Sequence, residues 1–328
     1  MNNLMTSSYK LTCVYVAISL VSIFFALSTS SFMTLWITLE ISSLFFVPIL
    51  THTPSLGSVE SKWKYFITQA LGSTLLLLSF NMSEMSSSHL MKLIWDNMMV
   101  VSLLMKLGAW PFGSWFVHLC ESLSWWSFFF VSSLQKIIPL IILSKMNLET
   151  GVFIISLSLI VLPFFMFTNS SFRWLLSYSS MYNTNWLALA SCVSFKCAMT
   201  YMFMYFLTFF CLLMTLSSSS LKKMSTISIN SGSWSDTSLK LMIVFFTSGF
   251  PPLGVFIPKI ELIFCLQNNF VMPVLLVISS SLVMLFYVKV ASLMSMSMEK
   301  DFFKKVFRTF SIVIMIMITL SSILGWII

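Results

Sequence analysis

Charge is scarce in this chain of 328 residues. Only 9% of the residues are Asp, Glu, Lys or Arg, whereas soluble domains carry about 25%. Hydrophobic residues make up 58% of the chain, and its mean hydropathy is +0.95. This balance excludes a soluble protein and predicts helices that cross a lipid bilayer. The formal net charge of +8 therefore indicates positively charged loops that orient the helices in the membrane, rather than a nucleic-acid-binding surface.

Sequence patterns that bind cofactors are also missing. The six cysteines form no CxxC and most lie in apolar runs, so we expect inert structural thiols rather than a disulfide framework or an iron–sulfur cluster. No GxGxxG or P-loop occurs, and the histidines His52, His89 and His118 lie near predicted helix ends. A haem site would need histidines in facing pairs at mid-helix. We therefore expect no cofactor and no metal on this chain.

What the sequence has in abundance is long apolar runs. About eleven have the roughly 17–25 residues that a bilayer core requires, and Pro, Gly, Ser and Asn mark the breaks between them. No soluble domain and no short repeat is visible. The prediction is an all-α polytopic bundle in a single transmembrane domain, 1–328, with approximate spans at 9–27, 31–51, 63–81, 93–113, 123–143, 151–170, 174–194, 198–217, 239–260, 268–291 and 307–327.

Lys and Arg are distributed unevenly between the two predicted sides. With the N-terminus on the positive side, the opposite side carries only Lys92, Lys145 and Lys196. This asymmetry follows the positive-inside rule, and it arises only with an odd number of spans. The first ten residues lack the features of a secretory signal or transit peptide, so we expect them to lead directly into the first span. The positive side carries Lys10, Lys62, Lys64, Arg173, Lys222, Lys223, Lys240, Lys300, Lys304, Lys305 and Arg308.

Four charged residues lie inside predicted spans. Lys106, Lys136 and Lys259 each have a proline nearby in the sequence, and Glu40 lies midway along its span. Proline removes a backbone donor and crowds the carbonyl four residues earlier, so the helices that carry Lys106 and Lys259 are predicted to be interrupted near mid-membrane. The prolines concerned are Pro111, Pro139, Pro251, Pro252 and Pro258.

Charges at mid-membrane are costly and persist mainly where they face a protein interior or a water-filled path. Glu40 and Lys106 are the obvious candidates for an ion pair. Lysine suits proton transfer because its pKa changes readily on burial. We interpret the four residues as a proton or cation path. The competing interpretation is a set of structural ion pairs and snorkelling side chains.

Several motifs carry a resemblance to a known family. The chain resembles the antiporter-like membrane subunits of mitochondrial NADH–ubiquinone oxidoreductase (respiratory complex I), its subunit 2 in particular, over nearly its whole length. The order and spacing of the motifs are more specific than any one of them. They are LEISSLFFVPIL (39–50), KYFITQALGSTLLLLS (64–79), MKLGAWPF with the following tryptophan (105–115), ESLSWW (121–126), QKIIP (135–139), YSSMYNTNW (178–186) and GFPPLGVFIPK (249–259).

The resemblance implies roles for the four charged residues. Glu40 and Lys106 match the family's coupling ion pair, Lys136 its central proton carrier, and Lys259 the lysine of its second broken helix. It implies a part in proton translocation coupled to electron transfer from NADH to ubiquinone, with other membrane-arm subunits and lipids as partners. NADH, FMN, iron–sulfur clusters and ubiquinone would then belong to other subunits. The N-terminus is expected in the matrix and the C-terminus in the intermembrane space.

The chain departs from the family pattern where titratable rings are expected. Gly113 and Asn183 replace the usual histidines, and Asn185 replaces the usual glycine. Val117-His118 stands where the family usually has Pro-Glu, and the glycine of GFPPLGVFIPK appears one place early, as Gly254. A relay between the lysines must then use water. We predict a hydrated cavity that links Gly113, Lys136 and Asn183, with polar groups from Ser114, Ser179, Ser180, Asn183 and Asn185.

Two other functions remain open from the sequence. A free-standing cation/proton antiporter would share the broken helices and buried lysines, but the family's full repeat pair takes about fourteen helices. A purely structural membrane subunit would use the charges only to hold helices together. Isolation of the active chain on its own would favour the antiporter, and normal pumping without Lys136 would favour the structural role.

Overall fold

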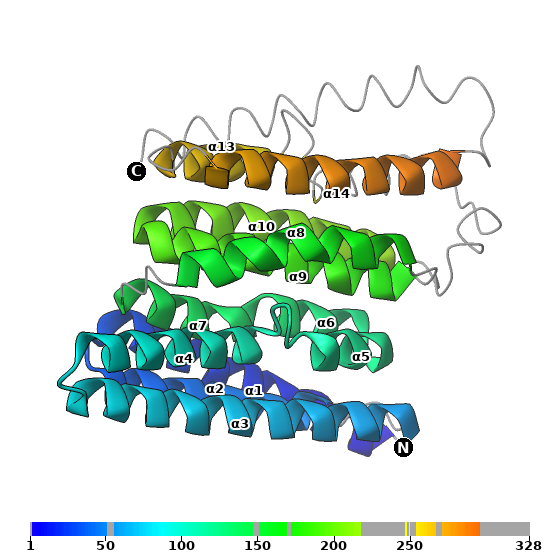
Figure 1. The fold of residues 1–328 in the computed structure, drawn as a ribbon. Coiled ribbons are helices and arrows are strands. Elements are labelled where there is room, and N and C mark those ends of the chain that lie inside the picture. Colours follow the sequence, from blue (N-terminus) through cyan, green and yellow to red (C-terminus); the bar gives the residue numbers. More distant parts are fainter. Residues whose placement is uncertain are drawn as a thin grey trace. The chain divides into compact units, whose positions relative to one another are not determined.

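The computed structural model describes the chain in segments. These are residues 2–50, 56–146, 151–168, 172–217, 247, 249, 254–266 and 271–295. Every regular element in them is a helix, as Figure 1 shows. The all-α prediction is therefore confirmed. The predicted span 307–327 and most of 239–260 lie outside the described residues.

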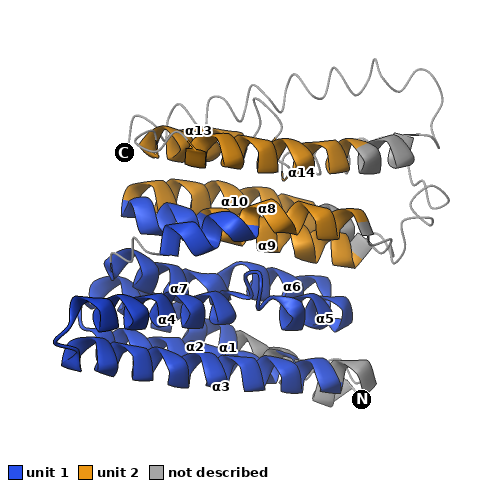
Figure 2. Ribbon diagram, in the orientation of Figure 1, with its two compact units in different colours: residues 1–158, 187–195 blue, residues 159–186, 196–328 orange. Residues whose placement is uncertain are grey.

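The chain divides into two compact units, coloured separately in Figure 2. The first comprises residues 1–158 and 187–195. Its helices are bundled lengthwise, and α3 packs closely along α4 while α1 packs along α2 (Figure 1). These helices are α1 (Asn2–Ser28), α2 (Phe32–Leu50), α3 (Leu56–Met85), α4 (His89–Leu107), α5 (Ser114–Ser122), α6 (Trp125–Ser132) and α7 (Leu134–Lys145).

The second unit comprises residues 159–186 and 196–328. Three described helices are divided between the units: α8 begins in the first unit, α9 ends in it, and α10 has its first residue, Phe195, there. The helices of this unit are most of α8 (Gly151–Thr168), most of α9 (Phe172–Val193), α10 (Phe195–Ser217), α13 (Phe256–Cys265) and α14 (Val271–Ser295).

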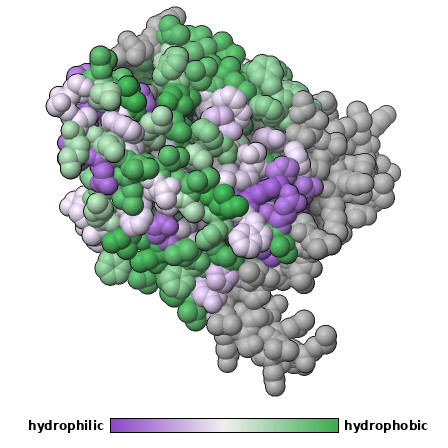
Figure 3. Space-filling model, turned by 60° about the horizontal axis from the view of Figure 1, so that its bottom comes forward, coloured by the Kyte–Doolittle hydropathy of each residue, from purple (hydrophilic) through white to green (hydrophobic). Residues whose placement is uncertain are grey.

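The helices fit a membrane environment. Within the described segments, four helical stretches are long and apolar enough to cross a bilayer by length and composition, and shorter apolar helices accompany them. Large apolar side chains such as Phe24, Trp63 and Leu285 are exposed, and hydrophobic residues cover most of the described face in Figure 3. Such a surface suits lipid rather than water. The four candidate spans are Val59–Met85, Trp125–Lys145, Phe195–Met214 and Val271–Val288.

Serines inside these helices are accommodated by their own backbone. The Ser42 hydroxyl donates to the Leu39 carbonyl over 2.8 Å, and the Ser79 hydroxyl donates to that of Leu76 over 3.0 Å. This local bond satisfies the hydroxyl donor without a partner on another helix. The serine content of the chain is therefore compatible with burial in apolar surroundings.

Helix interruptions are the main departure from straight spans. The predicted span 93–113 ends at Leu107 in α4, and residues 114–122, predicted to lie largely in a break, form the short helix α5. The predicted span 123–143 is divided at Ser133 into α6 and α7. In the second unit, a turn at Gly254 and Val255 precedes α13.

Candidate functional site

Helix α4 ends inside the first unit because Gly108 adopts a left-handed conformation with φ of 64°. The Gly108 amide donates to the Met105 carbonyl over 3.2 Å, and the Ala109 amide donates to that of Leu104 over 3.0 Å. This is the Schellman arrangement, in which a residue with positive φ closes the last turn. Pro111 lies within the connection to α5, where a proline cannot extend the helix.

Two side chains also donate hydrogen bonds to carbonyl groups of the last turn of α4. The Gln69 side-chain amide donates to the Lys106 carbonyl over 3.1 Å, and the Trp115 indole donates to the Met105 carbonyl over 3.2 Å. A helix that ends within a bilayer must find such donors, since no water is there to supply them. Gln69 from α3 and Trp115 from α5 thus stabilise the interruption beside Lys106.

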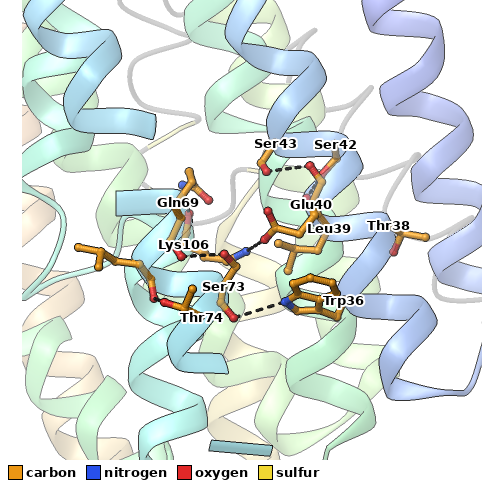
Figure 4. Close-up of polar contacts among 12 residues, drawn as sticks. Trp36, Thr38, Leu39, Glu40, Ser42, Ser43, Gln69, Ser73, Thr74 and Lys106 are labelled. Carbon is orange, nitrogen blue, oxygen red and sulfur yellow. Dashed lines mark hydrogen bonds and ion pairs between the residues drawn. The ribbon is translucent and has the colours of Figure 1, made fainter. Parts of the chain in front are cut away.

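The buried charge at this end is paired. Lys106 Nζ lies 2.8 Å from Glu40 Oε1, and the pair joins the last turn of α4 to the middle of α2 (Figure 4). The Lys106 side chain is only 1% exposed and that of Glu40 is 24% exposed. The negative end of the α4 dipole also complements the lysine charge. The structure therefore brings together the two residues that the sequence suggested as partners.

Gly72 on α3 makes room for the stem of this lysine. A Cβ atom at this position would lie 2.7 Å from Lys106 Cγ and 3.4 Å from the Ser102 carbonyl oxygen. Gln69 and Gly72 are three residues apart and so share a helix face. One face of α3 therefore both donates to the Lys106 carbonyl and leaves space for its side chain.

We expect Gly72→Ala to lower the thermal stability of the protein. The added methyl group must displace the Lys106 stem, and overpacking of this kind costs about 1–3 kcal/mol. The measurement is the aggregation temperature of the protein in detergent. Ala70→Val is the matched control, because Ala70 is exposed two residues away on the same helix. Equal melting of the two variants would mean that the lysine stem moves aside without cost.

Lys136 lies in the first turn of α7 and is 2% exposed. Its Nζ lies 4.7 Å from the centre of the Phe116 ring, a distance at which a cation is attracted to the ring face. The interruption at Ser133 lies three residues before it, and Pro139 is buried inside α7 itself. The sequence singled out Pro139 but predicted interruptions only in the helices that carry Lys106 and Lys259, so the break at Ser133 was not predicted.

Lys259 occupies the corresponding position at the start of α13 and is 3% exposed. Its Nζ lies 5.2 Å from the centre of the Tyr182 ring and 5.5 Å from that of Trp186. Gly249, with φ of 78°, leaves space for this lysine, because a Cβ atom there would lie 2.8 Å from Nζ. Pro258 precedes it in the first turn, where proline is tolerated.

The sequence suggested hydroxyl and amide side chains of α9 as polar groups for a water relay, and these side chains are buried. Ser179 and Ser180 donate to carbonyls of their own helix over 2.8 Å. Asn183 accepts a hydrogen bond of 3.1 Å from the Tyr201 hydroxyl on α10. Asn185 is fully buried, and among the described residues its amide group has no hydrogen-bond partner. Buried amide groups usually have a hydrogen-bond partner, either in the protein or in ordered water.

The remaining predicted residues are placed as follows. Gly113 is buried at the start of α5, and Ser114 next to it is exposed. Pro251 and Pro252 lie outside the described residues. Gly113 and Lys136 belong to one unit and Asn183 to the other, so the hydrated connection between them stays a prediction.

The residues that surround the buried lysines were not predicted from the sequence. Gln69 and Gly72 both lie in the quoted motif KYFITQALG, and Trp115 follows MKLGAWPF, so the motifs themselves were the available signal. Nothing in the spacing of Phe116 or Tyr182 distinguishes them from the other aromatic residues of the chain. Their role depends on which helices pack together.

Comparison with known proteins decides the family. Residues 29–286 match the family model described as "NADH:quinone oxidoreductase/Mrp antiporter, TM". The chain belongs to this family. The match covers most of the chain and includes Glu40 and the three buried lysines.

Curated relatives narrow the assignment within this family. The NADH-ubiquinone oxidoreductase chain 2 of Lumbricus terrestris is 29% identical over 278 residues, which is 82% of each protein. That of Anopheles gambiae is 31% identical over 242 residues, covering 71% of this chain and 70% of the relative. The chain is therefore a member of the chain 2 group.

A solved structure shares the fold. One chain of respiratory complex I from Thermus thermophilus with bound Aureothin superposes with a TM-score of 0.78 at 18% identity. The superposition covers 87% of this chain and 70% of that one. The antiporter-like fold predicted for the family is thus found here.

Proposed function

We propose that the chain is a core membrane-arm subunit of NADH:ubiquinone oxidoreductase, respiratory complex I, in the mitochondrial inner membrane. In this role it takes part in proton translocation coupled to electron transfer from NADH to ubiquinone. The names of the curated relatives support the assignment. The observation that carries the mechanism is the Glu40–Lys106 ion pair at the interrupted end of α4.

The chemistry proposed for this chain is proton transfer alone. Groups within about 2.6–3.2 Å exchange protons directly, and Glu40 and Lys106 lie within that range at 2.8 Å. A proton that passes between them converts a charged pair into a neutral one, which changes the electric field in the interior. Lys136 and Lys259 are the proposed carriers beyond the pair, each held against aromatic rings.

The redox groups are assigned to other subunits. NADH, FMN, iron–sulfur clusters and ubiquinone would bind elsewhere in the complex, and the partners of this chain are its neighbours in the membrane arm and lipids. Within the described segments, no group of three or more His, Cys, Asp and Glu residues could hold a metal ion. In this proposal the enzyme activity belongs to the assembly, and this chain contributes the proton path.

The first test of this proposal is assembly. We expect the chain to migrate with a large membrane complex that oxidises NADH, because its proposed work depends on redox centres in other subunits. Native electrophoresis of mild detergent extracts, followed by an in-gel NADH dehydrogenase stain and mass spectrometry, makes the measurement. A chain isolated alone and active in cation/proton exchange would instead be the antiporter that the family description also includes.

Orientation in the membrane provides a second test. We expect the segment 217–237 to face the matrix, because it lies on the side that carries most of the Lys and Arg residues. A membrane-impermeant label applied to mitoplasts should leave this segment unmodified, and the same label should reach it in inverted inner-membrane vesicles. Modification in intact mitoplasts would reverse the proposed topology.

A further inference from the structure

Two cysteines that are far apart in the sequence meet in the second unit. Cys197 lies in the first turn of α10 and Cys265 is the last residue of α13. Their sulfur atoms are 3.6 Å apart. The sequence predicted inert thiols, and the structure adds that these two sulfur atoms are in contact.

A second contact fixes the same pair of helix ends. The Thr200 hydroxyl donates to Glu261 Oε2 over 3.2 Å. Thr200 is one helical turn after Cys197, and Glu261 is one turn before Cys265. The first turn of α10 and the last turn of α13 therefore run side by side in opposite directions, with two side-chain contacts in register.

Both cysteines are at least partly exposed on the surface of the protein. Cys265 is exposed and Cys197 is partly exposed. Cys120, in contrast, is buried. Thiol exchange requires access as well as proximity. Among the described cysteines, Cys197 and Cys265 are the two whose sulfur atoms are close together and open to a small reagent.

We propose that Cys197 and Cys265 form a redox-active pair that exchanges with a low-molecular-weight disulfide such as oxidised glutathione. The Cys265 thiolate attacks one glutathione sulfur, breaks the glutathione disulfide and releases one glutathione thiolate. The Cys197 thiolate then attacks Cys265 Sγ in the mixed disulfide and releases the second glutathione. The two protein thiols lose two electrons and two protons, and both pass to the two glutathione molecules.

The bond requires only a small movement. A disulfide has sulfur atoms about 2.0 Å apart, so the present separation of 3.6 Å is closed by rotation of the two side chains and a slight approach of the helix ends. Cys197 lies in the first turn of α10 and Cys265 ends α13, and helix ends yield more easily than helix interiors.

The bond would restrain the helix that carries a proposed proton carrier. Lys259 lies on α13, six residues before Cys265, and Tyr201, the hydrogen-bond partner of Asn183, lies on α10, four residues after Cys197. A cross-link between these helices holds Lys259 and Tyr201 in one arrangement. We infer that it slows turnover, and this consequence rests on the function proposed above.

The test begins with the wild-type chain in its purified native complex. Co-migration of the chain with NADH dehydrogenase activity is established first, so that failure of the proposed function is seen separately. The complex is then incubated with oxidised glutathione, and the remaining thiols are alkylated. Non-reducing digestion and mass spectrometry are expected to yield a peptide pair joined through Cys197 and Cys265. NADH:ubiquinone turnover is expected to fall, and dithiothreitol is expected to restore it.

Serine variants provide the controls. In Cys265→Ser we expect no cross-linked peptide and no loss of turnover with oxidised glutathione. Cys211→Ser, at an exposed cysteine of α10, should behave like the wild type. Absence of the cross-link in the wild type overturns the proposal, and a cross-link that leaves turnover unchanged overturns its regulatory consequence.

Discussion

Proton translocation should fall by roughly tenfold or more when Lys136 is replaced by Met, with the complex still assembled. Lys136 is buried, and an unbranched apolar side chain of similar length fills its space at little cost in packing. The variant loses the group that carries the proton but keeps the fold. The measurement is proton uptake into proteoliposomes per NADH oxidised, with native electrophoresis to verify assembly.

Lys92→Met is the matched control for this prediction. Lys92 lies in α4 and is exposed, so the same chemical change there removes a solvated charge and should leave pumping unaltered. If Lys136→Met pumps normally while assembled, Lys136 is a structural residue. If the complex is lost, the test moves to Lys136→Arg, which preserves the charge but holds its proton permanently.

The second large effect is expected at the ion pair. Glu40→Gln should destabilise the assembled complex, because it leaves the buried ammonium group of Lys106 without its counter-charge. Breaking a buried pair costs about 3–5 kcal/mol, and the partial exposure of Glu40 places the expected value at the lower end. Thermal inactivation of NADH:ubiquinone turnover provides the measurement, alongside the rate before heating.

A double-mutant cycle separates the pair from its surroundings. We expect Glu40→Gln combined with Lys106→Met to be more stable than the sum of the single changes predicts, since neither charge is then left unpaired. Glu84→Gln, at an exposed position of α3, should have almost no effect. Additive losses in the cycle would mean that the 2.8 Å contact contributes nothing to stability.

Hydropathy and charge alone predicted much of this architecture. Apolar runs predicted the helices because length and composition are the main requirements of a bilayer. The cost of buried charge was enough to single out Lys106, Lys136 and Lys259 and to suggest Glu40 as a partner. These inferences succeed because the membrane restricts what a buried sequence can do.

The exact positions of the helix interruptions could not be predicted from hydropathy and charge. Pro111 predicted a break, but α4 ends earlier, at Leu107, because the positive φ of Gly108 closes the last turn first. Helix α5 was missed because its nine residues are too short to span a bilayer and include polar side chains. The break at Ser133 has no strong local signal, since serine is common throughout these helices.

The environment of each lysine depends on packing between helices. Gly72 and Gly249 are ordinary glycines in the sequence, and only the three-dimensional structure shows that each lies against a lysine side chain. The hydrated relay through Asn183 and Asn185 likewise stays a prediction. High-resolution density with ordered water at the Asn185 amide would support it, and an apolar plug between Lys106 and Lys136 would contradict it.

The shared face of α3 has a mechanical consequence. Gln69 donates to the Lys106 carbonyl and Gly72 leaves room for the Lys106 stem. A helix turns by about 100° per residue, so even a fraction of that rotation in α3 withdraws the amide and drives the helix surface against the lysine. Because Lys106 also holds Glu40, a rotation of α3 would act on the position of Lys106 and through it on the ion pair. A neighbouring subunit that rotates α3 would thereby change the separation between Glu40 and Lys106.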